Sequence, residues 1–222
     1  MFAEDEAHLI RRMQDFARAH QVYFFPSLLV LGDYKAPDRN RVLAIRPDRG
    51  IEYVHFKGRN PNAGYYAGNT IEVIDTPYGR IATPICFEME FHRFIRQVGE
   101  KRVDILIVPG DEPSKDNAIV HTEKSMFRCI ENGCSMLRTT LEGLTLGMDY
   151  QGRVLSQMNY FVTLDNRILI TELPVRGAPT LYARWGDWFA YGCAIILFFM
   201  VALGTRNADQ CSGEVVQVPS MS

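Results

Sequence analysis

Residues 71–90, with the sequence IEVIDTPYGRIATPICFEME, form the stretch from which the fold of this chain can be worked out. Two runs rich in strand-forming residues, Ile71–Asp75 and Arg80–Cys86, flank the turn Thr76–Gly79. Proline in this turn presets φ, and the glycine accepts a positive φ. Two strands joined by so short a turn predict a β-hairpin.

Cys86 lies at the end of the second predicted strand, shortly before a predicted helix over Phe91–Val98. Backbone N–H groups and the positive end of a helix dipole at such a position favour the thiolate, which is the nucleophilic form of cysteine. Between Ile85 and Phe87, however, a cysteine is more commonly a buried structural residue. The position alone leaves both interpretations open.

The composition indicates one globular domain with an appendage. The chain has 222 residues, of which 47% are hydrophobic, enough for a substantial core. A net charge of −2 and the lack of a long basic run argue against nucleic-acid binding. Five cysteines without CxxC spacing and five scattered histidines predict neither a disulfide framework nor a metal site, and we expect no cofactor.

The two ends of the chain differ in character. Met1–Glu6 is acidic and precedes no apolar segment, so no secretory signal is predicted. Trp188–Thr205 carries no charge, has aromatic residues at one end, and approaches the length of about 17–25 residues that spans a bilayer. We predict a transmembrane helix over residues 185–206 and a disordered tail over 207–222. A buried helix of a soluble core is the alternative.

The rest of the chain alternates helical and strand patterns. Helices are expected over Glu4–His20 and Asn117–Glu131, and strands over Gln21–Gly32, Arg41–Ile45, Ile51–Phe56, Val103–Val108, Leu144–Asp149, Arg153–Gln157 and Arg167–Val175. Such a mixture predicts an α/β domain, over residues 1–184, in which helices cover the sheets.

The hairpin stretch resembles the nucleophile segment of the nitrilase, or carbon–nitrogen hydrolase, superfamily. The family pattern Gly-x-Ile-x-x-x-Ile-Cys-Tyr-Glu is matched, with Phe87 in place of the tyrosine, by Gly79, Ile81, Ile85, Cys86 and Glu88. The Cys-aromatic-Glu form and residues 180–190 look most like the apolipoprotein N-acyltransferase branch. The resemblance runs from about Ala17 to Ala190. It implies a nitrilase-like α-β-β-α sandwich followed by one C-terminal transmembrane helix.

The resemblance also implies a chemistry. Cys86 would attack an acyl carbonyl to form a thioester, and Lys57, at the end of the third predicted strand, would stabilise the oxyanion. Glu88 is a candidate supporting acid. An amine would complete an N-acyltransferase that moves a fatty acyl group from phospholipid to the N-terminal amine of a lipoprotein, on the extracytoplasmic side of the bacterial inner membrane. Water would instead complete an amidase or nitrilase.

The general base that the resemblance implies is not found. In the family it ends a strand that precedes the helix corresponding to Glu4–His20, and this chain begins without such a strand. The glutamate that follows a loop glycine in the acyltransferase branch is replaced by Tyr65. We therefore expect an N-terminally incomplete, weakly active domain, with a hydrolase or a non-catalytic membrane-tethered domain as alternatives. Lys57 and Cys86 should nevertheless converge on one cleft.

Overall fold

The computed structural model describes residues 2–31, 39–58, 69–112, 114–162 and 166–212. The chain divides into two compact units, Met1–Arg184 and Trp185–Ser222. The replaced glutamate position, Tyr65, lies outside the described residues.

A three-stranded antiparallel sheet forms the N-terminal part of the first unit. Its strands, in the order β1-β2-β3, are β1 (Ser27–Val30), β2 (Arg39–Arg46) and β3 (Gly50–Phe56). Helix α1 (Phe2–His20) covers one face of this sheet, because its apolar stripe packs Ile10, Met13 and Ala17 against Leu43 and Ile45. Helix α1 and strands β2 and β3 thus lie where the sequence predicted them, whereas β1 is shorter than the strand predicted over Gln21–Gly32.

A six-stranded sheet forms the second half of the unit, with its strands in sequence order. They are β4 (Ile74–Thr76), β5 (Gly79–Ala82), β6 (Ile105–Gly110), β7 (Ser135–Thr140), β8 (Leu144–Met148) and β9 (Val154–Asn159). Strands β5, β6 and β7 are parallel, and the other pairs are antiparallel. Strands β4 and β5 are the predicted hairpin, with Ile74 opposite Ile81.

Two helices cover the outer face of the six-stranded sheet. Helix α2 (His92–Glu100) and helix α3 (Lys115–Asn132) pack beside each other, and apolar side chains of both join the core of the sheet. Gly133, with φ of 68°, ends α3 in the left-handed conformation that glycine adopts readily. Arg128 and Glu131, three positions apart on this helix, form an ion pair at 2.6 Å.

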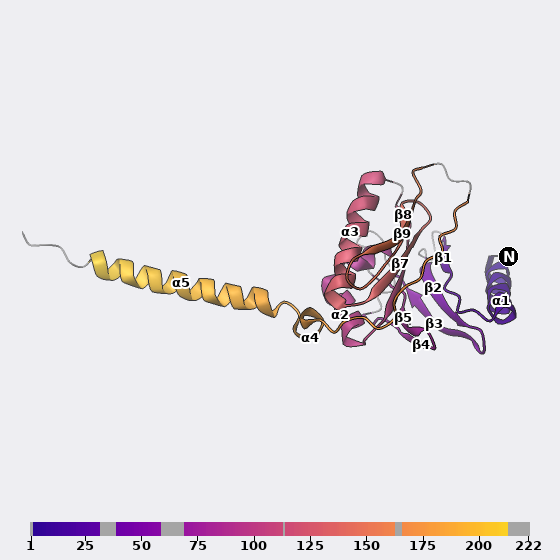
Figure 1. Cartoon of the computed structure of the whole chain (residues 1–222), viewed down its shortest axis with the longest axis horizontal. Helices are drawn as coiled ribbons and strands as arrows, with labels where there is room; N and C mark the ends of the chain where they lie inside the picture. The colour runs from indigo at the N-terminus through magenta and orange to yellow at the C-terminus, as the bar shows by residue number, and fades with distance from the viewer. Residues whose placement is uncertain (1, 32–38, 59–68, 113, 163–165, 213–222) are drawn as a thin grey trace, which may run out of the picture. The chain divides into compact units, whose positions relative to one another are not determined.

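The two sheets face each other and complete four layers, α-β-β-α (Figure 1). Ala44 of the smaller sheet packs with Ile74 and Ile81 of the larger one. A hydrogen bond of 3.1 Å between the hydroxyl groups of Tyr53 and Thr83 also crosses this interface. The sandwich predicted from the sequence is therefore the observed architecture.

The strand predicted over Arg167–Val175 is wrong. The whole of this segment is described, and it belongs to no strand of either sheet. Thr171 lies over Gly147 of β8, and the carbonyl of Pro174 accepts a hydrogen bond of 2.8 Å from the Ser135 hydroxyl. The segment contacts the sheet at these points, while its apolar residues Ile168 and Ile170 are largely exposed, so its apolar pattern does not reflect a buried strand.

The prediction of a transmembrane helix is also not borne out. After the short helix α4 (Leu181–Trp185), helix α5 (Trp188–Ser212) does form over the predicted apolar run. Within the part of the chain that the structure describes, however, no helix combines the length and apolarity that crossing a membrane requires. The uncharged run was already at the short end of the required length. Helix α5 also continues into the first residues of the predicted tail, whose remainder lies outside the described residues.

Candidate active site

Cys86 begins a 3₁₀ segment, η1 (Cys86–Glu90), which three residues separate from the end of β5. The predicted second strand is shorter than expected because Pro84 has no N–H to continue the ladder. The backbone of Cys86 has a φ of 46°, which is uncommon for a residue with a side chain. Such conformations cost free energy and are concentrated at functional sites. The turn holds the half-buried thiol between the two sheets.

The pKa of the Cys86 thiol is raised above its ordinary value, chiefly because burial disfavours the charged thiolate. The charge of Lys57 opposes this shift, Glu112 adds to it, and Arg138 and the backbone N–H of Asp111 oppose it more weakly. Burial thus opposes the thiolate that the position of Cys86 in the sequence favours. The five-residue 3₁₀ segment carries too little dipole to outweigh burial.

Lys57 directly follows β3, where its backbone N–H donates to the carbonyl of Asn40 at 2.8 Å. Its side chain and that of Cys86 line one cavity of about 420 Å³. The structure thus brings Lys57 and Cys86 to one cavity, one from the smaller sheet and the other from the segment that follows β5 of the larger sheet. Leu29 and Leu141, which are 58% and 74% exposed, line the same cavity and give it an apolar rim.

Glu88 is fully buried and joins the two segments that carry Lys57 and Cys86. One carboxylate oxygen accepts hydrogen bonds from the Ile85 backbone N–H at 2.7 Å and from His55 Nε2 at 2.8 Å. The other oxygen accepts from the Gly58 backbone N–H at 2.8 Å. Both oxygens are occupied by protein donors, so this carboxylate suits a structural brace better than a group that exchanges protons with a substrate.

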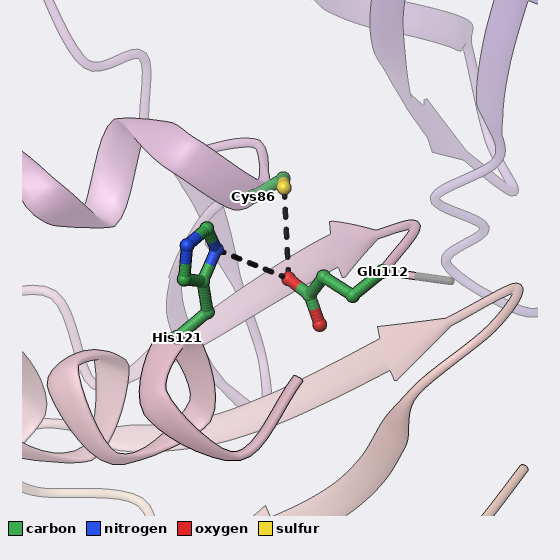
Figure 2. A group of neighbouring side chains, drawn as sticks. All are labelled: Cys86, Glu112 and His121. Atoms are coloured by element: carbon green, nitrogen blue, oxygen red, sulfur yellow. Dashed lines mark hydrogen bonds and ion pairs between the residues drawn. The ribbon is translucent and has the colours of Figure 1, made fainter. Parts of the chain in front are cut away.

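Three residues that the sequence did not single out surround the thiol. The Cys86 Sγ lies 3.7 Å from Glu112 Oε1, close enough for an S–H···O hydrogen bond. The imidazole of His121, on α3, points at the same oxygen with Nδ1 at 3.8 Å (Figure 2). Arg138, fully buried in β7, donates from its guanidinium to this oxygen as well. Glu112 is therefore the centre of the cluster.

The position of Glu112 follows from the strands around it. It comes just after the parallel strand β6, and its backbone N–H donates to the carbonyl of Glu142 at 3.1 Å. A side chain on Gly143, whose φ is 114°, would meet Glu112 Oε2 at 3.1 Å, so glycine there makes room for the carboxylate. Polar residues that follow buried central strands commonly form sites in α/β proteins, and this signal was present in the sequence.

The cluster also has the donor set of a metal site. One ligand atom each from Cys86, Glu112 and His121 lies within 4.8 Å of the other two. Thiolate, imidazole and carboxylate are the ligands that Zn²⁺ takes in proteins. The scattered histidines gave no sign of such a cluster in the sequence, because only the fold brings His121 beside Cys86 and Glu112.

Comparison with known proteins gives both a family and a fold. The carbon-nitrogen hydrolase family model matches residues 4–173. Apolipoprotein N-acyltransferase 1 of Treponema denticola is 27% identical over 150 residues, which are 65% of this chain and 27% of the relative. The apolipoprotein N-acyltransferase of Chlamydia caviae is 32% identical over 143 residues, 62% of this chain and 26% of that protein. The chain thus spans about a quarter of the length of these relatives.

Solved structures share the fold at lower identity. A mutant amidase from Nesterenkonia sp. AN1, with an acetamide moiety bound covalently to its active-site cysteine, matches with a TM-score of 0.61 and 14% identity. The match covers 71% of this chain and 65% of the amidase. Nit3 of Saccharomyces cerevisiae matches with a TM-score of 0.60 and 15% identity, over 68% of this chain and 60% of Nit3. At these identities the likeness is one of fold alone.

Proposed function

Because the chain belongs to the carbon–nitrogen hydrolase family, we propose that it is an N-acyltransferase that works through a Cys86 thioester. The acyl donor would be a phospholipid, and the acceptor the N-terminal amine of a lipoprotein. The observation that carries this proposal is the cavity that Cys86 and Lys57 share. Distant homology to the apolipoprotein N-acyltransferases favours this chemistry over others in the family.

The cavity supplies what acyl transfer needs. Cys86 Sγ would attack the ester carbonyl of the donor, and the ammonium group of Lys57 would stabilise the negative charge that develops on the carbonyl oxygen. Collapse of the tetrahedral intermediate would leave an acyl group on sulfur and release the alcohol. The amine of the acceptor would then attack the thioester and form the amide product.

The rim of the cavity supports a fatty acyl group as the transferred part. Leu29 of β1 and Leu141, in the turn after β7, line the cavity and expose large apolar surfaces to solvent, against which the chain of a donor would lie. Burial of such a chain releases about 0.8 kcal/mol for each methylene removed from water. Both proposed substrates occur at the bacterial inner membrane, and the proposal places the activity at its extracytoplasmic surface.

Trapping the acyl-enzyme tests the proposal. The chain is mixed with phosphatidylethanolamine vesicles, and intact-mass and peptide spectra should show a hydroxylamine-sensitive acyl group on Cys86. Addition of a diacylated lipopeptide with a free N-terminal amine should discharge this group into an amide. Discharge to free fatty acid alone would make the chain a hydrolase of the amidase type. Acyl transfer by Cys86→Ala at the original rate would overturn the proposal.

A further inference from the structure

We propose that a second cavity, between the ends of helices α2 and α3 and residues 176–184, binds a phosphate ester through Arg102, Arg176 and Arg184. The cavity has a volume of about 960 Å³, which is the size of sites that hold small organic molecules. None of its described lining residues lines the cavity of Cys86. The site is therefore separate from the proposed active site, and the proposal goes beyond acyl transfer.

Close backbone contacts build one wall of this cavity. A side chain on Gly177 would collide with the carbonyl of Gly133, and one on Gly133 would collide with the carbonyl of Ala178, so only glycine fits at either position. The hydroxyl of Thr180 donates a hydrogen bond to the carbonyl of Glu131 in the last turn of α3. Residues 176–184 are thus fixed to the end of α3, and the cavity is formed before a ligand enters.

Two of the arginines have a backbone conformation that favours glycine. The φ of Arg102 is 52° and that of Arg176 is 76°, both in the left-handed region. Arg102 directly follows Lys101, the C-cap of α2, where glycine is the usual residue. The backbone N–H of Arg176 donates to Asp104 Oδ1 at 3.0 Å. Side chains held in such strained conformations are concentrated at functional sites.

The guanidinium groups of Arg102 and Arg176 are free to meet a ligand. Within the ranges that the structure describes, neither guanidinium forms an ion pair or a hydrogen bond. Both residues are exposed, and Arg184 lines the same cavity. The three positive charges come from three separate segments of the chain, which the fold brings around one space.

Two acidic residues also line the cavity, and both are engaged by other groups. Glu100 pairs with Arg96, one turn earlier on α2, at 2.8 Å. Asp104 accepts hydrogen bonds from two backbone N–H groups, that of Arg80 at 2.8 Å and that of Arg176 at 3.0 Å. Neither carboxylate is paired with the guanidinium groups of the cavity arginines.

The helix ends do not account for the arginines either. A cation near the C-terminus of a helix commonly offsets the negative end of its dipole and caps its last carbonyls. The carbonyls of Gln97, Val98 and Gly99 in α2 already accept hydrogen bonds from backbone N–H groups that follow the helix. Those of Cys129 and Ile130 in α3 are satisfied in the same way. These carbonyls need no guanidinium donor.

The chemistry of the cavity indicates a phosphate ester. A guanidinium group can donate two parallel hydrogen bonds to phosphate, whose several oxygens serve more than one arginine. Ala178 and Pro179 are exposed and add apolar surface to the lining, against which an organic group can pack. Soluble phosphate esters and phospholipid headgroups share this combination of an anion and an organic part.

Calorimetric titration tests the site. The whole chain carrying Cys86→Ala, which cannot form a thioester, is titrated with glycerol 3-phosphate and with dihexanoyl phosphatidylglycerol. Added to this chain, Arg102→Gly or Arg176→Gly should each weaken binding by about 10–100-fold, the contribution of a hydrogen bond between charged groups. Arg93→Gln is the matched control, because Arg93 is exposed on α2 but does not line the cavity. This control should bind both probes as tightly as the chain with Cys86→Ala alone.

Melting curves separate binding from folding. Glycine adopts the left-handed conformation without strain, so Arg102→Gly and Arg176→Gly should melt at or above the temperature of the unaltered chain. Tighter binding of the lipid than of glycerol 3-phosphate assigns the site to a phospholipid, and the reverse order assigns it to a soluble ester. Unchanged binding in both glycine variants, an equal loss in Arg93→Gln, or no saturable binding of either probe would overturn the proposal. None of these results depends on acylation of Cys86, so the proposed function stands or fails separately.

Discussion

Replacement of Glu88 by glutamine should destabilise the fold by about 4 kcal/mol. The fully buried carboxylate accepts three hydrogen bonds, from His55, Ile85 and Gly58. Glutamine has one carbonyl oxygen and one amide group. The glutamine oxygen can accept the hydrogen bonds from His55 and Ile85, but the glutamine NH₂ group then points at the N–H of Gly58.

The magnitude follows from these three contacts. A hydrogen bond to a charged group contributes about 1.5–3 kcal/mol, and a buried donor without an acceptor costs about 1–3 kcal/mol. The bond to Gly58 is lost, its N–H is left opposite another donor, and the remaining two bonds lose their charge assistance. In a chain of this size, ~4 kcal/mol corresponds to a fall in Tm of roughly 8–16 °C.

Thermal unfolding followed by circular dichroism measures the effect. Glu90→Gln is the control on the same 3₁₀ segment, and because the Lys124 partner of Glu90 is half exposed, we expect a change below about 1 kcal/mol. The reasoning would be refuted if Glu88→Gln melted within a few degrees of the control, since three buried acceptor contacts would then contribute little.

The remaining predictions concern the cavity and the loop at Asp149. Lys57→Gln should slow acylation of Cys86 by about 10²–10³-fold. Because Lys57 lowers the pKa of Cys86, the same variant should also slow the alkylation of Cys86 by iodoacetamide at pH 7. Zn²⁺ should protect Cys86 from iodoacetamide, and His121→Asn should lose most of this protection if the three donors bind the ion together. Burial raises the pKa of Asp149, but hydrogen bonds from Arg153 and Gln151 outweigh burial and lower this pKa overall. The ionised carboxylate therefore stabilises the fold above about pH 4, and this stabilisation is lost as the pH falls through the lowered pKa. Asp149→Asn should therefore lower Tm at pH 7, and melts at pH 2 should show a much smaller difference.

Much of the sandwich could be predicted from local patterns. The apolar stripe of Glu4–His20, the Pro–Gly turn before Arg80 and the glycine after Asn132 each act within a few residues, and each indicates the element that the structure contains. The prediction of a strand over Arg167–Val175 was wrong because it also rested on a local pattern alone. An apolar extended segment has one sequence pattern whether it pairs in a ladder or lies across a sheet.

The site could be predicted only where a motif carried it. The resemblance singled out Cys86 and Lys57 as candidates, and the fold brings both to one cavity. Glu112 and Arg138, 26 positions apart, meet because β6 and β7 are parallel neighbours, which no short pattern records. The position of Cys86 in the sequence predicts a helix start, which favours the thiolate, but it does not record how deeply the thiol is buried, and burial raises the pKa of that thiol.

The order of the strands has a consequence for how the protein matures. Strand order equals sequence order in both sheets, so each sheet is built from its own continuous length of chain. The antiparallel ladders between sequence neighbours close short loops and form quickly, whereas the parallel ladders of β5, β6 and β7 close longer ones. The docking of one sheet on the other joins the most distant segments and comes last. Lys57 belongs to one sheet, and Cys86 with Glu112 to the other. During refolding, strand signal should therefore return before acylation does, and a chain with every strand in place but its halves undocked would have a nucleophile without its cation.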